Sequence, residues 1–170
     1  MGRSLIETNI IDDILIANFK ANALSADVFE QLNNILLSVE NDKTFKGVIF
    51  TSDNDKLFLA GADLFEMEKI IASKDEDQLR AIIEVGQKTY SRIQNLSVPT
   101  VATIHGVCLG GGYELALACD YRICSNDKNT KVGLPEVTLG ILPAWGGTTR
   151  LIRTINLPNA MKVLLTGAPF

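Results

Sequence analysis

The sequence has few features that would direct it to a membrane or to nucleic acid. Its 170 residues contain 16 Lys and Arg against 20 Asp and Glu, so the net charge is −4 and argues against polyanionic partners. No apolar run reaches the roughly 18 residues of a membrane span, and the N-terminus lacks the apolar stretch of a signal peptide. We therefore expect a soluble, cytoplasmic protein with no nucleic-acid partner and no membrane span.

Cysteine and histidine are also scarce. The three cysteines, Cys108, Cys119 and Cys124, form neither a C-x-x-C pair nor an even disulfide framework. We expect them to be reduced and to pack as small buried hydrophobic side chains. His105 is the only histidine, so we predict no metal site and no histidine-based triad.

What the sequence does contain is a globular composition in which strand-like and helix-like segments alternate. Hydrophobic residues make up 46% and charged residues 21%, which is typical of a folded domain, and the length fits one domain. The expected strands are residues 5–8, 13–19, 46–51, 100–104 and 121–125. The expected helices begin after Ser25, cover residues 64–71 and 77–96, and follow the glycines near residue 110, with loose segments at 73–77 and 125–131. This order predicts an α/β fold with a mostly parallel sheet.

Two glycine-containing segments are candidates for ligand binding. The first is Ala60-Gly61-Ala62-Asp63, and the second contains three successive glycines, Gly110-Gly111-Gly112, before an apolar helix. Glycines allow unusual dihedral angles and close approach, and the first amides of a helix are free to donate hydrogen bonds. Neither segment has the spacing of a dinucleotide or phosphate loop. A tight strand-to-helix junction explains any single glycine, whereas three together favour amides that serve a ligand.

Two glutamates in apolar surroundings add possible acid–base chemistry. Glu114 lies two residues after the glycines, and Glu136 follows Pro135. A carboxylate at a helix start or in a solvated loop would be the plain structural interpretation of each. Buried glutamates are rare without a partner or a function, so the two together indicate acid–base catalysis beside exposed amides.

These segments together resemble the crotonase superfamily. The similarity rests on their order: Ala60-Gly61-Ala62-Asp63, Gly110-Gly111-Gly112-Tyr113-Glu114, Leu134-Pro135-Glu136, Leu142-Pro143 and Gly146-Gly147-Thr148-Thr149-Arg150. Within the superfamily the chain is most similar to enoyl-CoA hydratases, especially the hydratase portions of bacterial multifunctional fatty-acid oxidation proteins. The resemblance implies a spiral of ββα units around a mostly parallel sheet.

The resemblance also implies an activity and its residues. The chain would hydrate trans-2-enoyl-CoA to 3-hydroxyacyl-CoA in fatty-acid β-oxidation, with no metal and no cofactor apart from the CoA of the substrate. The backbone N–H groups of Ala62 and Gly111 would form the oxyanion hole. Glu114 would activate water as the base, and Glu136 would protonate the α-carbon as the acid.

The implied CoA contacts lie around the first glycine segment. They are Ala21, Ala23, Leu24, Ala60, Gly61 and Asp63, with Lys56 near a phosphate. Lys56 is equally compatible with a solvated surface position, and Asp63 with a role in ordering its own turn. Ala144-Trp145 replaces the glycine and small residue usual in the family, which we expect to narrow the acyl pocket.

The family continues beyond the position equivalent to Phe170 with helices that cover the site and build trimer contacts. We therefore expect residues 1–170 to be a hydratase core without these helices, and a trimer only for longer members. Two alternatives stay open: an enoyl-CoA isomerase, which needs only the Glu136 carboxyl, and a non-catalytic acyl-CoA-binding fragment.

Overall fold

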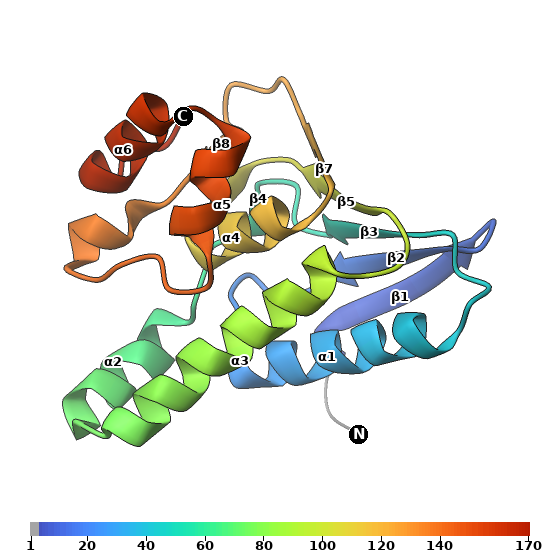
Figure 1. Ribbon diagram of the computed structural model, residues 1–170, viewed down its shortest axis with the longest axis horizontal. Helices are drawn as coiled ribbons and strands as arrows, with labels where there is room; N and C mark the ends of the chain where they lie inside the picture. The colour runs from blue at the N-terminus through green and yellow to red at the C-terminus, as the bar shows by residue number, and fades with distance from the viewer. Residues whose placement is uncertain (1–3) are drawn as a thin grey trace.

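The computed structural model describes residues 4–170 and contains two β-sheets with helices packed around them (Figure 1). The larger sheet has the strand order β1-β2-β3-β5-β7, and all neighbouring strands except β1 and β2 run parallel. Its strands are β1 (Ile6–Ile11), β2 (Ile14–Phe19), β3 (Gly47–Ser52), β5 (Thr100–Ile104) and β7 (Tyr121–Cys124). The prediction of a mostly parallel α/β fold is confirmed.

The β1–β2 hairpin is closed by a two-residue turn. Asp12 and Asp13 have positive φ angles of 51° and 66°, and Ile11 pairs directly with Ile14. Two successive residues of positive φ are typical of a type I′ turn, whose twist matches that of the flanking strands.

A smaller parallel sheet has the order β4-β6-β8 and was not predicted from the sequence. Its strands are β4 (Leu57–Leu59), β6 (Val107–Leu109) and β8 (Lys131–Gly133). Each follows a strand of the larger sheet along the chain and is followed by a helical segment. This repeated strand–strand–helix order matches the expected ββα units.

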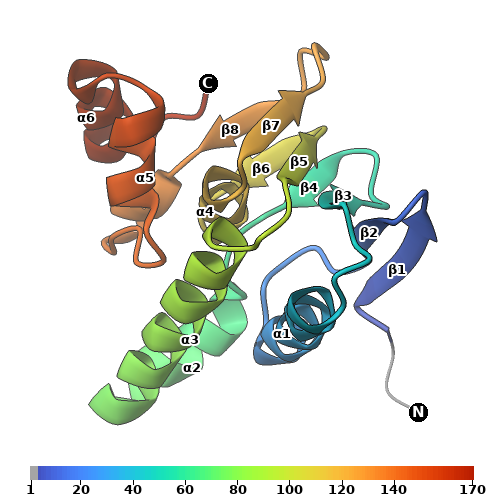
Figure 2. The same ribbon diagram turned by 45° about the vertical axis from the view of Figure 1, so that its right-hand side comes forward.

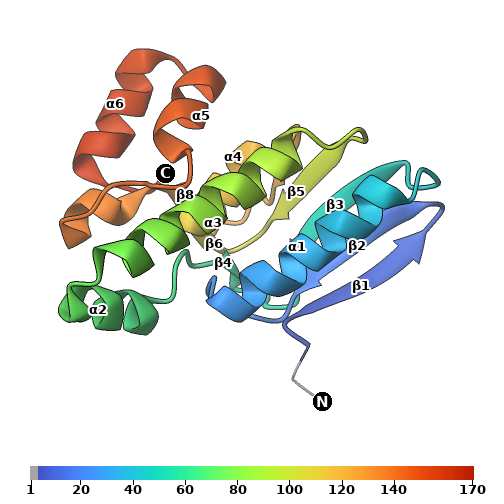
Figure 3. The ribbon, with the colours of Figure 1, turned by 60° about the horizontal axis from the view of Figure 1, so that its bottom comes forward.

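The helices lie around both sheets, and Figures 2 and 3 show them from two further directions. Helix α1 lies beside α3 and covers the larger sheet, while α2 and the first half of α3 form a hairpin that extends away from the sheets (Figure 3). The helical segments are α1 (Ala26–Asn41), α2 (Leu64–Ser73), α3 (Glu76–Gln94), α4 (Gly111–Ala118), the 3-10 helix η1 (Pro135–Leu139), α5 (Gly147–Thr154) and α6 (Leu157–Thr166).

Helix α1 shows how the sequence pattern produces the core. The Ser25 hydroxyl accepts a hydrogen bond from the Val28 amide at 3.4 Å, as expected for an N-cap. Val28, Leu32 and Val39 recur at helical spacing and are buried, so one face of α1 packs onto the sheet.

Two expectations are wrong. The segment 73–77 is not loose, because α2 ends at Ser73 and α3 begins at Glu76, capped by the Asp75 side chain. Cys108 and Cys119 are buried, but Cys124 is exposed because it lies on β7, which pairs only with β5 among the described strands. None of the described helices is both long enough and apolar enough to cross a membrane.

Candidate active site

The first part of the site is the start of helix α4, which is separated from strand β6 by the single residue Gly110. Gly110 has a φ of +54° and turns the chain into the helix. A Cβ on Gly112 would come within 2.4 Å of the Leu59 carbonyl oxygen, so this position must lack a side chain for α4 to pack on β4. The Tyr90 hydroxyl, from α3, donates a 2.8 Å hydrogen bond to the Gly111 carbonyl oxygen and fixes the first turn.

The second part is the segment of residues 60–62 between β4 and α2. The Leu24 amide donates to the Gly61 carbonyl oxygen at 2.8 Å, and the Ala60 amide donates to the Asn22 carbonyl oxygen at 2.9 Å. Gly61 has a φ of +95°, and a Cβ on it would lie 3.2 Å from the Gly111 nitrogen. The two glycine segments identified in the sequence are therefore in contact.

The amides of Ala62 and Gly111 are free to bind a ligand. Within residues 4–170, neither N–H group donates a hydrogen bond to another part of the chain. Both residues line one cavity. Unbonded backbone donors that border a mostly apolar cavity are suited to an oxygen atom that carries or develops negative charge.

Glu114 lies on α4 with its side chain buried. One carboxyl oxygen, Oε1, accepts hydrogen bonds from the Trp145 amide at 2.9 Å and the Gly147 amide at 2.7 Å. The pKa of Glu114 is raised to about 7, mainly by burial and also by the charge of Glu136, against the opposing effects of the two amides and Arg150. The carboxyl can therefore exchange a proton near neutral pH.

Glu136 lies in η1, directly after Pro135, and is only 8% exposed. Its Oε2 atom is buried and has no hydrogen-bond partner among the described residues, and its Oε1 atom lies 3.2 Å from a Cβ placed on Gly110. Burial raises the pKa of this carboxyl above its usual range. Glu136 is thus a buried acid beside the glycine segment rather than a solvated loop charge.

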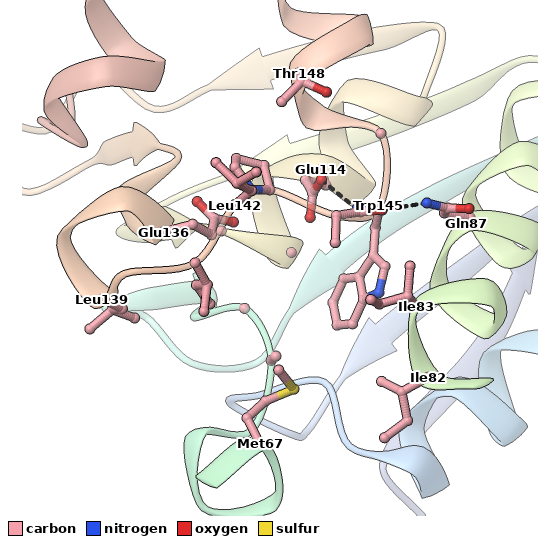
Figure 4. Close-up of a pocket in the computed structure, with 18 of the residues that line it drawn as sticks. Met67, Ile82, Ile83, Gln87, Glu114, Glu136, Leu139, Leu142, Trp145 and Thr148 are labelled. Atoms are coloured by element: carbon pink, nitrogen blue, oxygen red, sulfur yellow. Dashed lines mark hydrogen bonds between the residues drawn. The ribbon is translucent and has the colours of Figure 1, made fainter. Parts of the chain in front are cut away.

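The two glutamates face one cavity of about 780 Å³ (Figure 4). Ala60, Gly61, Ala62, Gly110 and Gly111 also line it. The remaining wall is mostly apolar and comes from α2, α3, η1, the following loop and α5: Met67, Ile71, Leu79, Ile82, Ile83, Gln87, Pro135, Leu139, Ile141, Leu142, Pro143, Ala144, Trp145, Gly146, Thr148 and Thr149. The site therefore combines acid–base groups and free amides with a long apolar surface.

The apolar wall from α3 was missed as a site by sequence reasoning. Leu79, Ile82 and Ile83 share the apolar face of α3 with Tyr90 and Ile93, and such a face is typical of a helix that packs on a core. Only Tyr90 and Ile93 are fully buried, whereas the first three line the cavity.

Only some of the candidate CoA-contact residues lie at the cavity. Leu24 is hydrogen-bonded to the residue 60–62 segment, whereas Ala21 and Ala23 do not line the cavity. Lys56 is exposed and also lies outside the lining, so its phosphate contact stays a prediction. The Asp63 carboxylate accepts hydrogen bonds from the Phe65 and Glu66 amides at 2.9 and 3.1 Å and caps α2. The structure thus assigns Asp63 a role in ordering its own turn.

A fold of ββα units with two buried glutamates and two free amides around one apolar cavity defines a crotonase-type protein. Residues 7–170 match the family model described as enoyl-CoA hydratase/isomerase, and the chain belongs to this family.

Individual relatives agree with this assignment. The chain is 46% identical over 153 residues to a fatty acid oxidation complex subunit alpha from Aliivibrio fischeri, covering 89% of the chain and 22% of that protein. It is 43% identical over 152 residues to the Vibrio vulnificus protein of the same name, covering 89% of the chain and 21% of the relative. The chain therefore spans about a fifth of these curated relatives.

Solved structures give the same fold. The crystal structure of an enoyl-CoA hydratase from Bacillus anthracis superposes with a TM-score of 0.89 at 35% identity, covering 98% of this chain and 64% of that one. A Geobacillus kaustophilus structure of the same type gives a TM-score of 0.90 at 31% identity, covering 100% of this chain and 64% of that one. The expected crotonase fold is confirmed.

Proposed function

We propose that this chain hydrates trans-2-enoyl-CoA thioesters to 3-hydroxyacyl-CoA, a lyase reaction of fatty-acid β-oxidation. The observation that carries the proposal is the meeting of two buried glutamates and two unbonded amides at one apolar cavity. Residues 1–170 would supply the hydratase core, and the reaction would take place in the cytoplasm. CoA would enter as part of the substrate, and no metal or other cofactor has a part in the proposal.

The amides of Ala62 and Gly111 would bind the thioester oxygen. Negative charge develops on this oxygen as water adds to the β-carbon and the acyl group becomes enolate-like. A preorganised donor of this kind typically contributes about 2.7–4 kcal/mol to transition-state stabilisation. Because the Tyr90 hydroxyl and the Leu24 amide hold the two segments, little reorganisation is needed when the charge forms.

The two glutamates would divide the proton transfers between them. Glu114 accepts two amide hydrogen bonds, which favour its carboxylate form, and would take a proton from water as the oxygen bonds to the β-carbon. Glu136 has an unpartnered buried oxygen, which favours its neutral form, and would give its proton to the α-carbon. Return of the proton from Glu114 to Glu136 through exchange with solvent completes the cycle.

Isomerisation of the double bond is the second candidate activity. It requires one carboxyl that removes a proton from one carbon of the acyl chain and returns it to another. The buried, unpartnered oxygen of Glu136 satisfies this requirement, whereas the hydrogen bonds that Glu114 accepts from two amides are not needed for it. The two reactions therefore differ in whether they need Glu114.

Loss of the ultraviolet absorbance of crotonyl-CoA would test hydration directly. We expect Glu114→Gln and Glu136→Gln each to reduce the hydration rate by roughly 100- to 10,000-fold, which is the usual contribution of a general acid or base. Isomerase activity that survives in Glu114→Gln, together with loss of hydration, would support both activities. Binding of crotonyl-CoA without turnover by the unaltered chain would instead support the acyl-CoA-binding alternative.

A further inference from the structure

A second cavity of about 450 Å³ lies between α1, α2 and α3, next to the candidate active-site cavity. Its exposed surface is mostly apolar, and its lining includes Phe29 from α1 and Ile70 from α2. Four residues line both cavities: Ala62, Met67, Ile82 and Trp145. These four residues form a shared wall between the two spaces.

Trp145 is the largest side chain of this shared wall, and its position is tightly determined. The residue is only 6% exposed. Its indole meets the Phe29 ring edge to face, with centroids 5.0 Å apart and planes at 81°, and meets the Tyr90 ring at 5.9 Å and 89°. Such aromatic contacts favour a single orientation over several.

Two glycines leave the space that the indole occupies. A Cβ on Gly86 would lie 2.3 Å from the indole Cδ1 atom, and a Cβ on Gly111 would lie 2.2 Å from Cζ3. Neither glycine has a positive φ, so the indole rather than the backbone conformation requires them to lack a side chain. The indole therefore lies between α3 and the start of α4, in contact with Gly86 and Gly111.

We infer that the Trp145 indole limits the length of the acyl chain that the site accepts, by closing the second cavity to it. This inference rests on the proposed function, because the acyl chain is placed by a thioester oxygen at Ala62 and Gly111. A short chain fits within the candidate active-site cavity, which has a volume of about 780 Å³. A longer chain that extends across the shared wall would enter the second cavity, and Trp145 is the largest side chain in that wall.

The side chain of Trp145 can be tested separately from its backbone. The hydrogen bond to Glu114 comes from the Trp145 amide and is retained by any replacement other than proline. Trp145→Leu removes the aromatic wall, and Trp145→Phe shortens it while preserving ring contacts with Phe29 and Tyr90. Far-ultraviolet circular dichroism and thermal unfolding identify which variants are folded, and a folded Trp145→Phe suffices for the test.

The measurement compares long with short thioesters in each folded variant. The readouts are kcat/KM for dodecenoyl-CoA and crotonyl-CoA, and calorimetric affinity for lauroyl-CoA and butyryl-CoA. We expect the long-to-short ratio to rise by roughly fourfold for each methylene that newly enters the second cavity. The control is Ile70→Phe, since Ile70 lines only the second cavity and is 7% exposed. Ile70→Phe alone should leave the long-to-short ratio unchanged. Combined with Trp145→Leu, it should abolish the rise in that ratio.

The outcomes separate this inference from the proposed function. An unchanged long-to-short ratio in the folded Trp145 variants overturns the inference, as does a gain that persists when Ile70→Phe is added. Failure of the unaltered chain to bind any acyl-CoA overturns the proposed function. Binding without turnover leaves the affinity ratio as the deciding measurement. Trp145 is the only tryptophan, so acyl-chain-dependent quenching of its fluorescence would support its position at the wall.

Discussion

At the scale of single residues, Arg150 supports the loop that binds Glu114 and makes a small contribution to the pKa of Glu114. One nitrogen of its guanidinium, Nη1, donates to the Trp145 carbonyl oxygen at 2.8 Å, and Nε donates to Gln94 at 2.9 Å. The positive charge also lowers the pKa of Glu114 against the effect of burial. Arg150 thereby supports both the loop that binds Glu114 and the charge state of Glu114.

Arg150→Met should therefore shift the pH dependence of hydration. Because the base must be ionised, the rising limb of kcat/KM against pH should follow the pKa of Glu114 in the free protein, which is about 7. Removing the guanidinium raises this pKa, so the rising limb should move to higher pH. Crotonyl-CoA kinetics over a pH series would measure the displacement.

Arg153→Met provides the matched control, because Arg153 lies on the same helix but is exposed. Its profile should stay close to that of the unaltered chain. Equal profiles for both variants and the unaltered chain would exclude an electrostatic role for Arg150. If Arg150→Met lowers the rate equally at every pH and leaves the rising limb in place, Arg150 acts only through packing of the loop.

At the scale of elements, the Asp63 cap links α2 to the segment that carries the Ala62 amide. Asp63→Ala removes two hydrogen bonds to the first turn of α2 and should lower the free energy of unfolding by about 1 kcal/mol. The loosened segment should also weaken acyl-CoA affinity. Asp63→Asn keeps an N-cap acceptor and should retain both properties, as measured by urea unfolding and calorimetry.

Asp75→Ala serves as the comparison, because Asp75 caps α3 through a 2.9 Å hydrogen bond from the Gln78 amide but does not line the site. It should cost similar stability and leave acyl-CoA affinity unchanged. Equal loss of affinity in Asp63→Asn and Asp63→Ala would instead mean that the Asp63 charge contacts the substrate.

The sequence predicted long elements well and short ones poorly. Helices α1 and α3 carry several turns of apolar periodicity, so their faces are readable. Strands β4, β6 and β8 have three residues each, which is too short to show a period of two. Their pairing depends on contacts between segments far apart in the chain.

The same limit applies to the candidate site. Glu114 and Glu136 were identified from their apolar neighbours and from the family resemblance. The contact between the two glycine segments, the binding of Glu114 by the Trp145 and Gly147 amides, and the second cavity behind Trp145 are tertiary features. No local pattern encodes them, because each joins residues at least 25 positions apart or several elements at once.

At the scale of the whole molecule, the buried site should make stability depend on pH. The pKa of Glu114 is about 7 in the folded chain against 4.5 for an unperturbed glutamate, so between these values the folded state binds more protons than the unfolded state. The free energy of unfolding should therefore fall as pH rises through this window, by roughly 3 kcal/mol at about 1.4 kcal/mol per pH unit. Carboxyls with a lowered pKa, such as Glu40 beside Arg92, act with the opposite sign and below this window.

Urea unfolding between pH 4.5 and 7 would measure this dependence on Glu114. Glu114→Gln is neutral throughout, so most of the fall in stability should disappear, leaving the contribution of Glu136, whose pKa is raised by burial. Glu84→Gln is the control, because Glu84 lies on the surface and its pKa is lowered by Lys88; the fall should remain intact in that variant. A fall of equal size in Glu114→Gln and in the unaltered chain would mean that Glu114 is ionised in the folded state across the whole range. In that case the pH dependence of the molecule would have to arise from Glu136, which the Glu136→Gln variant would reveal in the same experiment.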